Sequence, residues 1–376
     1  MSLRGLLCAL TMCRAGLRQL SLPSVVGMTA LAGCVTPAAE RVERDAAVGR
    51  AESGSNRVHV RGGLAVVRDF SRERLVLWAN APSLRVDLEV DGTQPLELRV
   101  SNCMPDAELS PSTREVEVMP LASGRPTECR WELRPHSSRF HIALRSSRDS
   151  LGSFEFAVLS DIQDAIDDVQ DIYRLINAEP SLAFVLGVGD LTSQGTEEEL
   201  QRFEEELGGL HVPYYATLGN HELGVSPPLF HDYFGRGSAH FVFGGVHFTF
   251  LDSASATIDP AVYEWLDGWL EAGEASPHVV ATHIPPIDPV GVRNGSFASR
   301  AEAAKLLGRL ADGGVDLTLY GHIHSYYRFQ NAGIPAHISG GGGAIPETFD
   351  GIGRHFMVVT MDGDRGVLGT RTVAVD

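Results

Sequence analysis

Short apolar runs in the C-terminal part of the chain each end where a cluster of polar residues begins, and this arrangement constrains the fold most strongly. The runs cover residues 154–160, 182–189, 212–218 and 279–283 and are typical of buried strands. The polar clusters are, in chain order, Asp161-Ile162-Gln163, Gly189-Asp190, Gly219-Asn220-His221-Glu222, His283 and Gly321-His322-Ile323-His324. If the strands lie side by side in a sheet, these clusters meet at one edge of it.

Helix-start signals lie between the apolar runs. Each signal pairs a capping residue with a glutamate or a proline: Thr196 with Glu199, Ser299 with Glu302, and Asp259 with Pro260. Two further runs, 241–243 and 246–251, flank Gly244-Gly245 and predict antiparallel strands. This alternation of strands and helices predicts a layered α/β domain over the part of the chain after residue 150.

The side chains in the polar clusters are carboxylates, amides and imidazoles, and no thiolate is among them. This set of donors suits divalent iron, manganese or zinc. In His322-Ile323-His324 the alternation allows both imidazoles to face a metal while Ile323 packs away. We therefore expect a metal site where the strand ends meet.

Taken together and in this order, the clusters resemble the calcineurin-like metallophosphoesterase superfamily. The pattern of that family is Asp-x-His, Gly-Asp, Gly-Asn-His-Asp/Glu, His and Gly-His-x-His, and the resemblance covers residues 153–376. It implies a four-layer α-β-β-α sandwich. It also implies that the protein is a phosphoric ester hydrolase.

The resemblance assigns roles to individual residues. Asp190 is expected to bridge two divalent ions (Mn, Fe, Zn or Mg), because a shared carboxylate offsets the repulsion between cations about 3.5–4 Å apart. Asp161 and His324 complete one site, and Asn220, His283 and His322 complete the other. The metals activate a water that attacks phosphorus. His221 matches the general acid that gives the leaving alkoxide its proton.

Gln163 departs from the family pattern, which usually has a histidine at this position. A glutamine amide oxygen is a weaker and harder donor than imidazole, so the first metal is expected to bind less tightly or to shift towards manganese or magnesium. The alternative is that Gln163 does not ligate and only donates a hydrogen bond to a group beside the metal.

Ser193 and Gln194 mark a second departure. The serine/threonine phosphatase branch of the family carries an aspartate and a phosphate-binding arginine at these places, so protein phosphatase activity is not expected. The same aspartate orients the histidine acid in that branch. His221 must therefore be oriented by another group or be less effective.

The run Gly340-Gly341-Gly342-Gly343 lacks the Lys-Ser/Thr ending and the helix start of a phosphate-binding P-loop. We expect it to form a backbone turn that passes close to the metal cluster.

Residues 58–148 alternate apolar and polar side chains, which is the pattern of half-buried strands. Leu84 to Val90 and Leu96 to Val100 show it clearly, and Asp91-Gly92 between them suggests a hairpin turn. Trp78 and Trp131 are candidates for the core between two sheets. We predict a small β-sandwich that acts as a structural spacer or supports the α/β domain.

Residues 1–33 are typical of a signal peptide, with arginines first, an apolar run next and small residues at the end. Leu31-Ala32-Gly33-Cys34 resembles the lipobox of bacterial lipoproteins, which implies that Cys34 is lipidated and anchors the protein to a membrane. An ordinary cleaved signal is the alternative. Residues 34–57 lack apolar periodicity and predict a flexible tether. The expected location is the periplasmic or surface face of the bacterial cell envelope.

Cys103 and Cys129 are the cysteines left once Cys8, Cys13 and Cys34 are assigned to the N-terminal segment. In an oxidising compartment this pair predicts a disulfide. Two buried free thiols are the alternative.

The chain carries a formal net charge of −17, and residues 1–33 contain arginines but no acid, so their removal makes the remainder more acidic. Such a surface repels nucleic acid and anionic membranes, because both are bound mainly by clustered lysine and arginine. We expect no nucleic-acid partner. An anionic substrate would need locally bound cations.

Two classes of function remain open. The first is hydrolysis of a phosphate ester, with a phosphodiester slightly favoured over a phosphomonoester because no dedicated dianion-binding arginine is visible. The second is a non-catalytic, metal-containing surface module that binds a component of the cell envelope.

Overall fold

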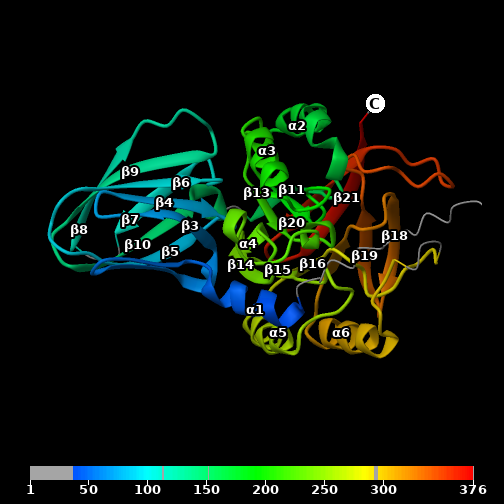
Figure 1. Ribbon diagram of the computed structural model, residues 1–376. Coiled ribbons are helices and arrows are strands. Elements are labelled where there is room, and N and C mark those ends of the chain that lie inside the picture. Colours follow the sequence, from blue (N-terminus) through cyan, green and yellow to red (C-terminus); the bar gives the residue numbers. More distant parts are fainter. Residues whose placement is uncertain (1–36, 112–113, 151, 292–294, 376) are drawn as a thin grey trace, which may run out of the picture. The chain divides into compact units, whose positions relative to one another are not determined.

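The computed structural model describes residues 37–111, 114–150, 152–291 and 295–375 (Figure 1). Its C-terminal part contains two mixed sheets. The first has the strand order β13-β12-β11-β20-β21 and the second β14-β15-β16-β17-β19-β18. Within the described residues, no helix combines the length and the hydropathy needed to cross a membrane.

The strands of the first sheet are β11 (Ser153–Leu159), β12 (Leu182–Val188), β13 (Tyr214–Thr217), β20 (His355–Asp362) and β21 (Gly366–Ala374). Those of the second are β14 (Ala239–Phe243), β15 (Val246–Leu251), β16 (His278–Thr282), β17 (Leu317–Tyr320), β18 (Tyr326–Asn331) and β19 (Ile334–Ser339). The two sheets pack face to face through a shared aromatic core, in which the rings of Phe156 and Phe248 meet at 5.4 Å between centroids.

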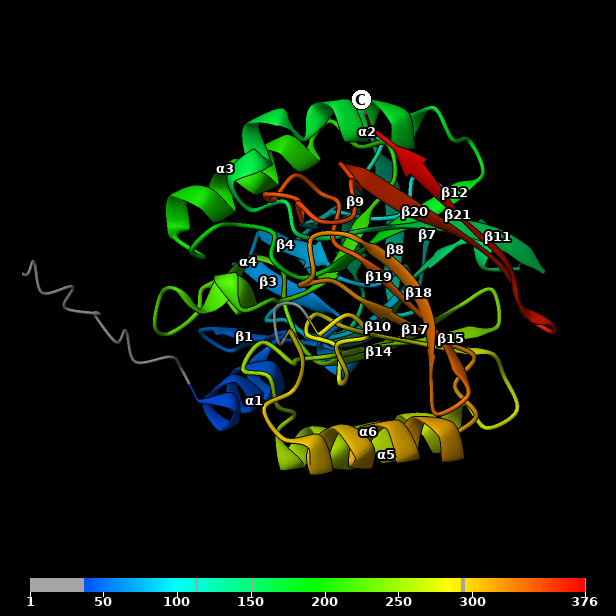
Figure 2. The same ribbon diagram turned by 90° about the vertical axis from the view of Figure 1, so that its right-hand side faces the viewer.

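Helices cover the outer face of each sheet, so the predicted four-layer α-β-β-α sandwich is confirmed. Helices α2 (Gln170–Asn177) and α3 (Glu197–Leu207) bury their apolar faces against the first sheet. Helices α5 (Pro260–Ala272) and α6 (Arg300–Asp312) do the same on the second sheet. Figure 2 shows these two pairs of helices on opposite sides of the strands.

The helices begin where the sequence predicts. Thr196 and Glu199 form a reciprocal capping box at the start of α3. Asp259 caps α5 by accepting from the amide of Ala261, and Ser299 caps α6 by accepting from the amide of Glu302. Each cap satisfies an amide that has no partner within the helix.

The N-terminal part contains two five-stranded sheets that share one core, as expected for a small β-sandwich. The first sheet is formed by β1 (Arg50–Ser53), β2 (Asn56–Val60), β5 (Leu84–Glu89), β10 (Arg139–Ser146) and β7 (Ala107–Pro111). The second is formed by β3 (Ala65–Phe70), β4 (Arg74–Ala79), β6 (Leu96–Ser101), β9 (Glu128–Pro135) and β8 (Val116–Leu121). Cys103 and Cys129 are joined in a disulfide.

The predicted hairpin around Asp91-Gly92 is wrong. Strand β5 pairs with β2 and β10, whereas β6 pairs with β4 and β9 in the other sheet. The connection therefore crosses between the sheets, and both strands keep their apolar faces towards the common core. Of the two tryptophans, Trp131 lies in that core, but Trp78 packs against Phe234 of the α/β part.

Two asparagines tie the sandwich to the edge of the first α/β sheet. The side-chain amide of Asn80 both donates to and accepts from the backbone of Ala216 on β13, at 2.9 and 2.8 Å. Asn102 pairs in the same way with the backbone of Tyr214, at 2.8 Å for each bond. The two side chains thus satisfy the open edge of β13, which would otherwise expose unpaired backbone groups.

The predicted flexible tether over residues 34–57 is wrong for the residues that the structure describes. Residues Ala38–Ala47 form helix α1, and strands β1 and β2 follow. Helix α1 is held by buried charge, because the guanidinium of fully buried Arg41 donates to both carboxylate oxygens of Asp252 at 2.6 and 3.1 Å. Asp45 accepts from the amides of Gly237 and Ser238. Apolar periodicity could not reveal a helix anchored by polar groups.

The predicted signal peptide and the lipidation site Cys34 lie outside the described residues.

Candidate metal centre

The polar clusters converge at one edge of the two sheets. Asp161 follows β11, Asp190 follows β12, Asn220 follows β13, His283 follows β16, and His322 and His324 follow β17. Ligand atoms of Asp161, Asp190 and His324, the first donor group, lie within 4.8 Å of one another, and so do those of Asp190, His283 and His322, the second donor group. The Asn220 side-chain oxygen lies 3.1 Å from Nε2 of His283. Two donor groups therefore share Asp190, as the resemblance implies.

The donors fit divalent cations. The carboxylates of Asp161 and Asp190 are almost fully buried, with 0% and 1% of their surface exposed. Among the described residues neither has a lysine or arginine partner, and histidines are their only ion-pairing neighbours. A buried pair of carboxylates without a permanent cation is costly. Metal ions bound between these oxygen and nitrogen donors would remove that cost.

The backbone is strained at three donors and at Gln163. Asp161, Gln163, Asp190 and His322 have φ values of 60°, 49°, 52° and 69°, a conformation that non-glycine residues rarely adopt. Such strain persists only where the surrounding structure holds it, and it is concentrated at functional sites.

Backbone carbonyls fix the imidazole rings. Nδ1 of His283 donates to the carbonyl of Val188 at 2.8 Å, and Nδ1 of His324 donates to the carbonyl of Ile345 at 2.7 Å. Because Nδ1 carries the hydrogen, Nε2 of each ring is free to face the metal position. The hydroxyl of Ser160 donates to Asp161 at 2.6 Å and orients that carboxylate.

Proton binding and metal binding are coupled at this centre. Burial lowers the pKa of His283, but the carboxylates of Asp190 and Asp161 outweigh it and raise this pKa to about 9. Burial raises the pKa of Asp161. Metal ions compete with these protons for the same atoms, so binding releases protons and strengthens with rising pH.

Glu222 is a structural residue of the site to which the sequence analysis gave no role. Its fully buried carboxylate accepts from the amides of Gly219, Asp190 and Thr192 at 2.7, 3.0 and 3.0 Å. It therefore locks the loop of Asp190 to the loop of Asn220. The sequence signal that could have identified Glu222 is its place as the last residue of Gly219-Asn220-His221-Glu222.

Gln163 lies within the first donor group. Its amide nitrogen is 2.9 Å from Oδ2 of Asp190 and 3.2 Å from Nε2 of His324. The nitrogen and oxygen of a glutamine amide exchange places by a rotation that leaves the shape of the side chain unchanged. The side chain can therefore present its oxygen to a metal or donate a hydrogen bond to Asp190. Both roles of Gln163, metal ligand and hydrogen-bond donor, remain predictions.

Replacing Gln163 with histidine is expected to raise the metal content of the first site, since imidazole is the stronger donor. Metal analysis after dialysis against a weak chelator measures the change, with Gln170→His on the outer helix α2 as the matched control. Equal metal content in wild type and Gln163→His would show that Gln163 does not ligate.

His221 is oriented by a backbone carbonyl in place of the missing aspartate. Its Nδ1 donates to the carbonyl of Ser193 at 2.6 Å, which leaves Nε2 3.8 Å from Oδ2 of Asp190. The side chain is 35% exposed, so a substrate can reach it. In the sequence, Ser193 is notable only because it replaces the aspartate of the serine/threonine phosphatase branch. Every residue has a backbone carbonyl, so the sequence does not predict that this carbonyl orients His221.

The glycine run passes beside the centre, as expected. A Cβ atom on Gly340 would lie 2.3 Å from the carbonyl oxygen of Ile323 and 3.0 Å from Oδ2 of Asp161. A Cβ on Gly342 would lie 2.4 Å from the carbonyl oxygen of Ser160. Only glycine permits this approach of backbone to backbone.

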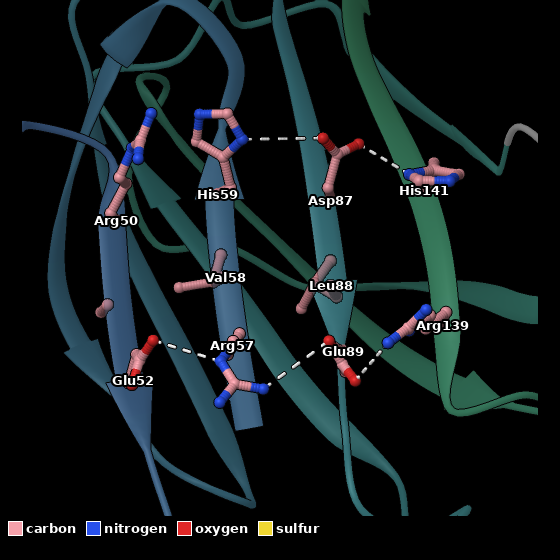
Figure 3. A pocket seen from close by; sticks show the side chains of 11 residues that line it. Arg50, Glu52, Arg57, Val58, His59, Asp87, Leu88, Glu89, Arg139 and His141 are labelled. Atoms are coloured by element: carbon pink, nitrogen blue, oxygen red, sulfur yellow. Dashed lines mark hydrogen bonds and ion pairs between the residues drawn. The ribbon is translucent and has the colours of Figure 1, made fainter. Parts of the chain in front are cut away.

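A shallow pocket of about 520 Å³ lies elsewhere, on the outer face of the sheet that contains β1, β2, β5 and β10 (Figure 3). Its charges largely pair with each other across the strands. Arg57 lies between Glu52 and Glu89, and Asp87 contacts both His59 and His141. None of the metal-centre residues lines this pocket, so we place the chemistry at the strand ends instead.

Comparison with known proteins identifies the part of the chain that carries the centre. The family model described as calcineurin-like phosphoesterase matches residues 154–326. A 3′,5′-cyclic-nucleotide phosphodiesterase of Nostoc sp. is 25% identical over 171 residues, which are 43% of this chain and 63% of that protein. A probable glycerophosphodiester phosphodiesterase of Arcobacter nitrofigilis is 39% identical over 51 residues, which are 14% of this chain and 19% of that protein. The matches thus span less than two thirds of either relative.

Solved structures also align with part of this chain at low sequence identity. A dimetal phosphatase from Danio rerio aligns with 59% of this chain and 99% of its own, at a TM-score of 0.46 and 15% identity. GAP50 of Plasmodium, described as the anchor in the inner membrane complex, aligns with 60% of this chain and 90% of its own chain, at a TM-score of 0.43 and 17% identity. With the family match and the converging donors, residues 154–326 form a calcineurin-like phosphoesterase domain.

Proposed function

We propose that this protein is a metal-dependent phosphoric ester hydrolase that acts on a phosphodiester in preference to a phosphomonoester. The observation that carries the proposal is the pair of donor groups that share Asp190, with Nε2 of His221 3.8 Å from that carboxylate. The family match over residues 154–326 supports it. We expect two divalent ions per chain.

When bound, the metal ions supply a water of lowered pKa as nucleophile and neutralise the phosphate oxygens. The residues of the chain do the rest. Asp161, Asp190, Asn220, His283, His322 and His324 would hold the ions at the strand ends. The carbonyl of Ser193 holds the ring of His221 so that Nε2 points to the site. From Nε2 a proton passes to the oxygen that leaves phosphorus.

Replacing His221 with alanine is expected to lower kcat by about 10²–10⁴-fold while the metal content stays the same. The loss should be largest for esters with a poor leaving group, because such a group needs the proton most. Turnover of an alkyl and a 4-nitrophenyl phosphodiester measures the difference. His211→Ala, an exposed histidine outside the centre, is the control. Equal losses for both leaving groups would argue against an acid role.

The preference for diesters rests on charge. A dianionic monoester is usually held by a guanidinium group placed for two hydrogen bonds. This chain has Gln194 where the serine/threonine phosphatase branch carries its phosphate-binding arginine. A higher kcat/KM for a 4-nitrophenyl monoester than for the matching diester would reverse this assignment. Absence of turnover on any ester, with metal bound, would favour the alternative of a non-catalytic envelope-binding module.

We also propose that the mature protein is a lipoprotein of the bacterial cell envelope, anchored through Cys34. The lipobox resemblance of Leu31-Ala32-Gly33-Cys34 supports it. Cys34→Ser is expected to move the protein out of the membrane fraction, whereas Cys13→Ser, in the segment expected to be removed, should not. Mass spectrometry of the mature N-terminal peptide provides the direct check. An unmodified Cys34 would exclude the anchor.

A further inference from the structure

The three most exposed large apolar side chains among the described residues are Ile345, Phe349 and Ile287. They are 75%, 49% and 46% exposed, whereas the other large apolar side chains at the surface are less so. Single exposed apolar residues are common, but a group of them at one place marks a site of interaction. We call these three residues the apolar rim.

The apolar rim lies on two loops next to the metal centre, the one that follows His283 and the one that precedes β20. The carbonyl of Ile345 accepts from Nδ1 of His324, and the amide of the preceding Ala344 donates to the carbonyl of Asp161 at 2.8 Å. The segment that ends in Phe349 is therefore fastened to the first donor group. Ile287 follows His283 of the second donor group by four residues. In Figure 1 the loop after β16 (yellow) and the loop before β20 (orange) both lie on the right-hand side of the domain.

The loop before β20 is held in place, so its apolar side chains are presented by a defined backbone. The carboxylate of Asp350 accepts from the hydroxyls of Ser325 and Tyr327, both at 2.6 Å. These bonds join the loop to the strand that follows His324. Phe349, next to Asp350, is therefore exposed on an ordered support beside the metal ligands.

Resting on the proposed hydrolase function, we propose that the apolar rim receives the hydrocarbon part of the substrate, so that the substrate class is amphiphilic phosphodiesters with an acyl or alkyl chain. Water adds to phosphorus, one P–O ester bond breaks, and the leaving oxygen takes a proton. The products are an alcohol and a phosphomonoester. The chain lies against Ile287, Ile345 and Phe349 while the phosphate lies at the metal centre.

The charge of the protein restricts how such a substrate is presented. With a net charge of −17, the chain is repelled by a strongly anionic lipid surface. An apolar contact with a zwitterionic or neutral surface carries no such penalty. We therefore expect phosphatidylcholine vesicles, whose lipids are themselves amphiphilic phosphodiesters, to be hydrolysed faster than vesicles of phosphatidylglycerol.

Two esters that differ only in chain length test the proposal: methyl 4-nitrophenyl phosphate and dodecyl 4-nitrophenyl phosphate, below its aggregation concentration. Each buried methylene group contributes a factor of about four, so burial of a few of them predicts a kcat/KM at least about tenfold higher for the dodecyl ester. Ile345→Ser and Phe349→Ser are each expected to reduce this ratio severalfold. Leu175→Ser and Leu368→Ser, exposed elsewhere on α2 and β21, should leave it unchanged.

The outcomes separate the inference from the function on which it rests. If neither ester is hydrolysed, the hydrolase function fails. If both are hydrolysed with equal kcat/KM by the wild type, the function stands and the apolar rim does not bind the chain. The assignment would also be overturned if Ile345→Ser and Phe349→Ser left the dodecyl-to-methyl ratio of kcat/KM unchanged. Binding to vesicles without a preference for the dodecyl ester would overturn it as well. Melting temperatures of the serine variants show that any loss is not caused by unfolding.

Discussion

Replacing Asp190 with asparagine is expected to reduce ester hydrolysis to background and to abolish stabilisation by metal. The asparagine keeps the shape of the side chain but removes the charge that both donor groups share. Wild-type protein in Mn²⁺ at about a hundredfold excess over the Kd should gain about 2.7 kcal/mol of stability, because the metal binds only the folded state. The variant should gain little. Thermal unfolding with and without Mn²⁺, together with turnover, measures both effects.

Asp167→Asn is the matched control for this change. The Asp167 carboxylate is 79% exposed and forms a surface ion pair with Arg202, away from the donors. Asp167→Asn makes the same chemical change at a residue outside the donor groups, so turnover and stabilisation by metal should match the wild type. A fully active Asp190→Asn variant would show that this carboxylate does not bridge metal ions.

Replacing Arg41 with alanine is expected to lower the free energy of unfolding by about 3–5 kcal/mol, because it leaves the buried carboxylate of Asp252 without its partner. Arg41 is fully buried and Asp252 is 5% exposed. Alanine is a good helix former, so the propensity of α1 is not the cause of the loss. Urea unfolding in the presence of a chelator measures the effect apart from metal binding.

Arg44→Ala on the same helix is the control. Arg44 pairs with Asp232, which is 62% exposed, and a surface pair of this kind contributes at most about 1 kcal/mol. Adding Asp252→Asn to Arg41→Ala should recover part of the loss, because it removes the unpaired charge. Equal losses for Arg41→Ala and Arg44→Ala would contradict the buried pair.

The docking of α1 also bears on the centre. Asp252 precedes Ser253, whose hydroxyl accepts from the amide of Ile284 at 2.8 Å. Ile284 follows the donor His283, so a few backbone steps connect the N-terminal helix with the metal site. Residues 38–47 are therefore part of the domain that holds the donors, and truncations should begin before Ala38.

The sequence predicts the parts of this molecule that depend on local signals. The strand-end clusters around Asp161, Asp190 and His283 follow from short apolar runs, and the start of α3 follows from Thr196 and Glu199. Each signal acts within a few residues, where spacing and hydrogen-bonding capacity decide the structure.

The parts that escaped prediction depend on distant partners. Arg41 and Asp252 are separated by 211 positions, and no local sequence pattern near either residue predicts the pair. The crossing after Asp91-Gly92 depends on which strands β5 and β6 join, and alternating side chains fit a hairpin equally well. The orientation of His221 comes from the carbonyl of Ser193, a group that every residue possesses.

The fold explains why the donors come from such distant stretches. Parallel strands carry their C-terminal ends to the same edge, and two sheets facing each other bring the ends of β11, β12 and β13 opposite those of β16 and β17. Glu222 and the glycine run then draw the loops together. Of the apolar rim, Ile287 stands on the loop of His283, and Ile345 and Phe349 stand on the loop of the glycine run, so the proposed site for the hydrocarbon chain lies beside the donors.

Anomalous diffraction from crystals grown with Mn²⁺, collected on either side of the manganese absorption edge, tests the central claim most directly. We predict two manganese peaks on either side of the Asp190 carboxylate, one also contacted by Asp161 and His324 and the other by Asn220, His283 and His322. No peak at Asp190, or manganese bound only at other residues, would contradict the account.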